Sequence, residues 1–96
     1  MYARHILFKS SPEKRKAIEA MADDIYAFTK SLNGFVSATY LVSEDESEYG
    51  SVTLWSSRED AEAAAAAILE EFKETMEKVM DGPPEVTMFQ VYRPES

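Results

Sequence analysis

The stretch NGFVSATYLVSEDESEYGSVTLWSSRED, from Asn33 to Asp60, decides the fold of this chain. Its opening Asn-Gly pair is a helix stop, because both residue types adopt the left-handed conformation at little cost. Next come an apolar run, the acidic segment 43–48 and a second apolar run that ends at Trp55. A helix start follows at Ser57. This order predicts a hairpin of two strands between two helices.

One amphipathic helix is predicted on each side of the hairpin. The first begins at Ser11-Pro12, and its apolar residues recur at spacings of three and four: Ile18, Met21, Ile25, Phe28 and Leu32. The second is capped by Ser57 and ends before the prolines at 83 and 84. Its stripe consists of Ala61, Ala65, Ile68, Phe72, Met76 and Val79.

Two more strands flank these helices, so that the predicted strands are Tyr2–Lys9, Phe35–Ser43, Tyr49–Ser56 and Glu85–Tyr92. The order βαββαβ predicts an α+β, ferredoxin-like fold: a four-stranded antiparallel sheet with two helices on one face. The whole chain, 1–96, is one domain.

Both alternating faces of the predicted strands are apolar. In the strand at 35–43, strict alternation places Phe35 and Leu41 on one face and Val36, Tyr40 and Val42 on the other. The pattern therefore leaves open which face meets the helices. The face that they do not cover would remain apolar, which predicts a homodimer through the sheet.

Composition excludes several classes of function. The net charge of −8 argues against binding nucleic acid or anionic membrane surfaces, since no basic stripe is present. No segment approaches the roughly 20 apolar residues of a membrane span. The chain has no cysteine, which excludes thiolate chemistry and favours the reducing cytoplasm. With one histidine and no cysteine, no transition-metal site is expected.

Three short motifs carry a resemblance to a known family: Gly34-Phe35, the run Leu54-Trp55-Ser56-Ser57, and Gly82-Pro83-Pro84. With the order of elements from Tyr2 to about Arg93, they resemble the dimeric α+β barrel superfamily, in particular the antibiotic biosynthesis monooxygenase-like family. The resemblance implies a two-fold dimer and a cavity between sheet and helices. It also implies oxygenation of phenolic or quinol-like aromatics without a cofactor.

The sequence departs from the family at two positions that matter for chemistry. Thr53 stands where many quinol-type members carry a glutamate, two residues before the aromatic residue that ends the third strand. The second helix has no histidine, which many of these members also carry there. The sequence also argues against the haem-degrading branch, because the asparagine, tryptophan and histidine trio of that branch is missing.

Two residues in the first strand are candidate catalytic groups. His5 is the natural general base, because its ordinary pKa lies near neutrality. Arg4 is the candidate stabiliser of an oxyanion. Adjacent strand residues point to opposite faces, so both cannot line one cavity. The alternative is a histidine packed at a dimer or core surface and an arginine in a surface or interface ion pair.

Aromatic residues supply candidate ligand contacts: Trp55, Tyr40, Tyr26 and Tyr92. Aromatic walls with a few polar tips suit a flat ligand, although such residues also fill cores and interfaces. The leading hypothesis is a small-molecule-binding protein with cofactor-independent oxygenase activity. The rivals are a non-catalytic, stress-associated dimer that binds a ligand or partner, and a structural subunit.

Overall fold

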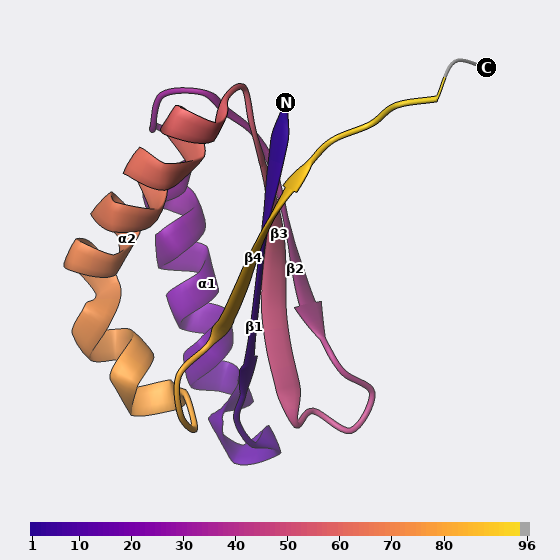
Figure 1. Cartoon of the computed structure of the whole chain (residues 1–96). Helices are drawn as coiled ribbons and strands as arrows, with labels where there is room; N and C mark the ends of the chain where they lie inside the picture. Colours follow the sequence, from indigo (N-terminus) through magenta and orange to yellow (C-terminus); the bar gives the residue numbers. More distant parts are fainter. Residues whose placement is uncertain (95–96) are drawn as a thin grey trace.

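A computed structural model describes residues 1–94, and the last two residues of the predicted domain lie outside the described residues. Figure 1 shows the strands and helices in the predicted order. The elements are β1 (Tyr2–Lys9), a short 3-10 helix (Pro12–Lys14), α1 (Arg15–Thr29), β2 (Phe35–Val42), β3 (Glu48–Trp55), α2 (Arg58–Val79) and β4 (Glu85–Gln90). The predicted βαββαβ order is confirmed.

The four strands form one antiparallel sheet in the order β2-β3-β1-β4. Both helices cover the same face of this sheet (Figure 1). This is the predicted ferredoxin-like α+β fold. No helix within residues 1–94 is long and apolar enough to cross a membrane.

The structure answers which sheet face meets the helices. On β1, Phe8 packs in a buried cluster with Ile18 and Met21 of α1. Because strand residues alternate, Arg4 shares the helix-covered face with Phe8, and His5 points to the opposite, outer face. The outer face carries Ala3, Leu7, Val52, Leu54 and Phe89 around His5.

A β-bulge in β2 overturns the strict alternation predicted there. The pairing with β3 shifts register between Phe35 and Ser37, because one strand carries an extra residue. Phe35 consequently turns toward the helices, where its ring meets Trp55 edge-on at 5.6 Å between centroids. The prediction that Phe35 shares a face with Leu41 is therefore wrong.

Helix α1 ends at Thr29, earlier than its apolar stripe predicted. The chain then tightens into turns, with Ser31 N donating to Phe28 O and Leu32 N donating to Thr29 O. The Ser31 hydroxyl also donates to Phe28 O at 2.7 Å, which competes with a further helical turn. Gly34 still supplies the predicted reversal, at φ 78°.

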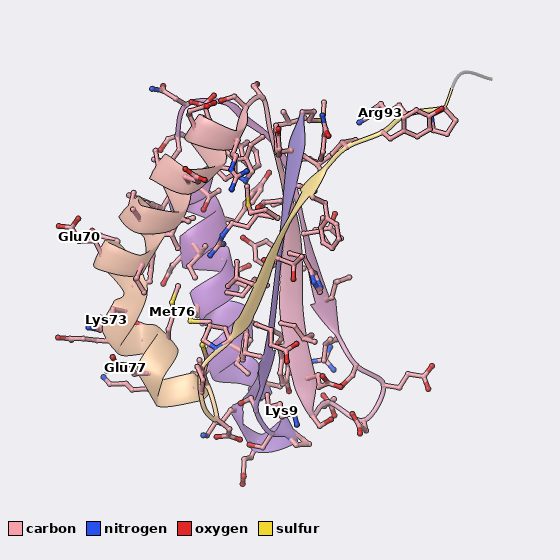
Figure 2. The ribbon with its side chains drawn as sticks, viewed as in Figure 1. Lys9, Glu70, Lys73, Met76, Glu77 and Arg93 are labelled. Carbon is pink, nitrogen blue, oxygen red and sulfur yellow. The ribbon has the colours of Figure 1, made fainter. Side chains whose placement is uncertain are left out.

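Helix α2 begins as predicted, but Ala64 rather than the predicted Ala65 is its second buried alanine. Asp60 N donates to Ser57 Oγ at 3.1 Å, which confirms the cap. Ser11, in contrast, makes no side-chain cap before α1. Figure 2 shows Met76 pointing inward from α2, while Glu70 and Lys73 project outward. The buried residues of α2 are Ala61, Ala64, Ile68 and Val79.

Candidate functional site

A cavity of about 290 Å³ lies between the sheet and the two helices. This volume is at the lower end of the range for small-molecule sites, roughly 300–1,000 Å³. Its walls are largely apolar. The lining residues are Arg4, Ile6, Phe8, Arg15, Ile18, Glu19, Met21, Ala22, Ile25, Thr29, Tyr40, Leu41, Val42, Tyr49, Gly50, Ser51, Thr53, Ile68, Met76 and Met80.

The cavity has two ends: Arg4 lies at one, and the ion-paired Arg15 and Glu19 lie at the other, near the start of α1. On β1 and β3, Arg4 pairs with Thr53 near Trp55, whereas Phe8 pairs with Tyr49 near the opposite edge. Helix α1 runs from Ile18, which packs on Phe8 and Tyr49, toward Thr29. The end of the cavity near Trp55 is therefore bordered by Arg4, Thr53 and Thr29. We call this region the Arg4 end of the cavity.

Arg4 is a half-buried cation without a carboxylate partner. Within residues 1–94, the ion pairs closer than 4.0 Å all involve other cations. Burial lowers the pKa of Arg4, since the charged form loses solvent. A guanidinium still stays protonated in a protein. The cavity therefore holds a positive charge that no nearby anion neutralises, which suits an anionic ligand atom.

Arg15 lines the same cavity in a different electrostatic state. Its Nη1 donates to Glu46 of the β2–β3 turn at 2.6 Å, and its Nε donates to Glu19 at 3.4 Å. Hydrogen bonds to Glu46 and Glu19 raise the pKa of Arg15. One residue of the acidic segment 43–48, Glu46, is therefore committed to an ion pair. The charge of Arg15 is neutralised within the protein.

Hydroxyl groups complete the polar lining. Trp55 Nε1 donates to Thr53 Oγ1 at 2.8 Å, so Thr53 holds the buried indole at the Arg4 end. Burial is the largest cause of the raised pKa of Tyr40, and the charges of Tyr26 and Asp23 add to it. The Tyr40 hydroxyl consequently stays protonated at neutral pH and can donate a hydrogen bond.

The candidate site residues predicted from the sequence lie in different parts of the structure. Arg4 and Tyr40 line the cavity, whereas His5 lies on the outer face of the sheet. Tyr26 joins Tyr40 in a neighbouring open groove with Glu19 and Asp23. Trp55 is 1% exposed, packs against Ala61 and Ala64, and does not line the cavity. Tyr92, 82% exposed, follows β4 and lines neither space.

Sequence reasoning missed several lining residues. Thr29 gave no signal, because one polar residue near a helix end usually faces solvent. Met21, Met76 and Met80 form part of the cavity wall, although methionines on the apolar face of a helix ordinarily fill a core. Within residues 1–94, no three histidine, aspartate or glutamate side chains are placed to hold a metal ion.

The fold and the cavity define a class: small α+β proteins with a ligand-sized space between a ferredoxin-like sheet and its helices. The chain belongs to the antibiotic biosynthesis monooxygenase family, whose model matches residues 1–78. A search of curated proteins found no match.

Solved structures from several bacteria share the fold. Rv0793 from Mycobacterium tuberculosis is 20% identical with a TM-score of 0.82, and the match covers 99% of this chain and 98% of that one. The monooxygenase from the gene ActVA-Orf6 of Streptomyces coelicolor, in complex with the ligand Nanaomycin D, is 20% identical with a TM-score of 0.81, covering 99% and 90%. SnoaB, a cofactor-independent oxygenase from Streptomyces nogalater, is 18% identical with a TM-score of 0.78, covering 97% and 94%. At these identities the likeness shows the fold.

Proposed function

We propose that this chain binds a small phenolic or quinol-type aromatic in the cavity and oxygenates it with O2 without a cofactor. The observation that carries the proposal is Arg4, a half-buried cation with no carboxylate within 4.0 Å in residues 1–94, inside a largely apolar cavity. Two similar folds belong to proteins described as a monooxygenase and a cofactor-independent oxygenase, which supports this choice of reaction.

Arg4 would favour ionisation of the bound phenol. An opposite charge within a few ångströms lowers the pKa of an acid, typically by about 1–3 units. The proton can then leave to solvent, so the reaction does not require a histidine in the cavity. Apolar walls exclude water from the anion, and the Tyr40 hydroxyl is available as a hydrogen-bond donor.

For an anthrone-like phenol, the atoms and electrons of the proposed oxygenation balance in the following steps. The anion passes one electron to O2, and the resulting carbon radical and superoxide combine to a peroxide at the reacting CH2 carbon. The proton lost on ionisation returns to the peroxide. Loss of water then leaves a carbonyl, so that one oxygen atom enters the product and the other leaves as water.

A second candidate is a non-catalytic ligand-binding protein, and a specific observation favours it. Thr53 stands where many quinol-type relatives carry a glutamate, and its hydroxyl oxygen is engaged by the Trp55 indole. No histidine lines the cavity, and its one carboxylate, Glu19, is bonded to Arg15. Such a protein would bind the phenolate at Arg4 and release it unchanged.

Oxygen uptake separates the two candidates. We expect oxygen uptake with at least one compound from a panel of hydroquinones and anthrone-like phenols. For that compound, one O2 should be consumed for each carbonyl group formed in the product. The His5→Ala variant is expected to turn over within about twofold of wild type, because His5 lies on the outer face. Ligand binding without oxygen uptake for any compound of the panel would favour the non-catalytic ligand-binding protein. A large loss in His5→Ala would contradict the cavity as the reaction site.

We also propose that the outer face of the sheet pairs with a second copy of this chain. In one chain this face leaves Phe89 51% exposed, with His5 and Val52 on the neighbouring strands. The central strands carry no carboxylate on this face from Ala3 to Leu7, and Glu85 lies on it only at the edge strand β4. Lack of cysteine still favours a cytoplasmic location for this dimer.

Light scattering after size-exclusion chromatography tests the dimer. Val52→Lys puts a charge at the centre of the outer face and is expected to give a monomer, because an unpaired buried charge costs several kcal/mol. Leu69→Lys is the matched control, since Leu69 is 54% exposed on α2, which packs on the other face. A wild-type monomer, or a Val52→Lys dimer, would contradict the proposal.

A further inference from the structure

Thr29 carries a buried hydroxyl group that the protein itself does not satisfy. The residue is 1% exposed, and its Oγ1 is the one buried side-chain polar atom in residues 1–94 that lacks a hydrogen-bond partner. Buried polar groups are nearly always paired, so each exception calls for an explanation. A threonine near a helix end often donates to the carbonyl four residues earlier, and Thr29 makes no such bond.

The position of Thr29 supplies the explanation. Thr29 borders the cavity from α1, at the same end as Arg4 and Thr53 on the sheet. Helix α1 and the sheet form opposite walls of the cavity, so Thr29 and Arg4 border the same end of it from two sides. Threonine populates two χ1 rotamers in helices, which gives the hydroxyl a second orientation. A hydroxyl can donate or accept, so it matches either a second hydroxyl or a carbonyl.

We infer that Thr29 is a specificity residue that recognises a second oxygen atom on the ligand, beside the anionic oxygen held by Arg4. This inference rests on the proposed function of the cavity and narrows its ligand class to aromatics that carry two oxygen atoms. The other hydroxyl at this end, that of Thr53, already accepts from Trp55. Thr29 is thus the hydroxyl at the Arg4 end that remains unused before a ligand binds.

Matched ligands and an isosteric variant test the inference. 2-Naphthol and 2,3-dihydroxynaphthalene differ by one hydroxyl, and Thr29→Val replaces the hydroxyl by a methyl group. Calorimetry under argon measures binding without turnover. Thr29→Val is expected to lower the affinity for the diol by about tenfold relative to that for the naphthol, the loss of one hydrogen bond. Thr29→Ser keeps the hydroxyl and is expected to retain the preference for the diol.

Thermal unfolding without ligand gives an independent readout. Removing an unsatisfied buried hydroxyl is expected to raise the Tm of Thr29→Val by roughly 4 °C. A lower Tm would mean that the hydroxyl is bonded within the free protein, which overturns the inference. The inference is also overturned if Thr29→Val loses the same affinity for both ligands, or loses affinity for neither. In either case, ligand binding by the wild type would leave the proposed function intact. If neither ligand binds the wild type, both proposals fail.

Discussion

Replacing Arg4 with methionine is expected to weaken binding of a phenolate ligand by about 100-fold. Removing one partner of a buried charge pair costs roughly 2–5 kcal/mol, and about 2.7 kcal/mol corresponds to 100-fold. Methionine keeps much of the length and the apolar contacts of the side chain. Oxygen uptake at low substrate concentration is expected to fall by the same factor, because the anion is both the bound and the reacting form.

Arg15→Met is the matched control for this prediction. Arg15 lines the same cavity, yet Glu46 and Glu19 already neutralise its charge. Ligand affinity is therefore expected to stay within about threefold of wild type. Arg4→Met should also unfold at the same temperature as wild type or higher, since it removes a desolvated charge. Equal losses in the two variants would show that Arg4 has no special role.

Replacing Gly50 with alanine is expected to unfold the protein or destabilise it by about 3 kcal/mol or more. A Cβ atom at Gly50 would collide with the backbone carbonyl oxygen of Ile6 on the neighbouring strand. Strand β1 is bonded on both sides, to β3 and to β4, so its backbone cannot move away cheaply. Denaturant unfolding monitored by Trp55 fluorescence measures the change.

Gly82→Ala provides the comparison. Gly82 has a positive φ of 89°, but a Cβ there would meet nothing within 4 Å. Only the conformational penalty of roughly 1–2 kcal/mol applies. Gly50→Ala should therefore be the more damaging variant, and the reverse order would contradict the close contact between β3 and β1.

The central stretch predicted the fold because turn chemistry and hydrophobic period agree there. The Gly34 reversal and the Ser57 cap are local features, and both are present in the structure. The bulge at Phe35 escaped prediction, since period-2 reasoning cannot register an extra residue. The early end of α1 depends on Ser31 bonding to the backbone, which its apolar stripe does not reveal.

The site was predictable only in part. Alternation correctly implies that Arg4 and His5 face opposite sides, but two apolar faces hide which side holds the cavity. The lack of a carboxylate near Arg4 depends on contacts between distant segments, as does the pairing of Arg15 with Glu46. Thr29 carries no signal in the sequence, because its burial and its unpaired hydroxyl depend on the tertiary structure.

The most direct test of the account is the ionisation of a phenol bound in the cavity. The absorbance spectrum of 2-naphthol distinguishes phenol from phenolate, and a pH titration with excess protein gives the pKa of the bound ligand. We predict a bound pKa at least about one unit below that of the free ligand, and no such decrease in Arg4→Met. An unchanged pKa in the wild type, or the same decrease in both proteins, would contradict the claim that Arg4 holds an anionic oxygen.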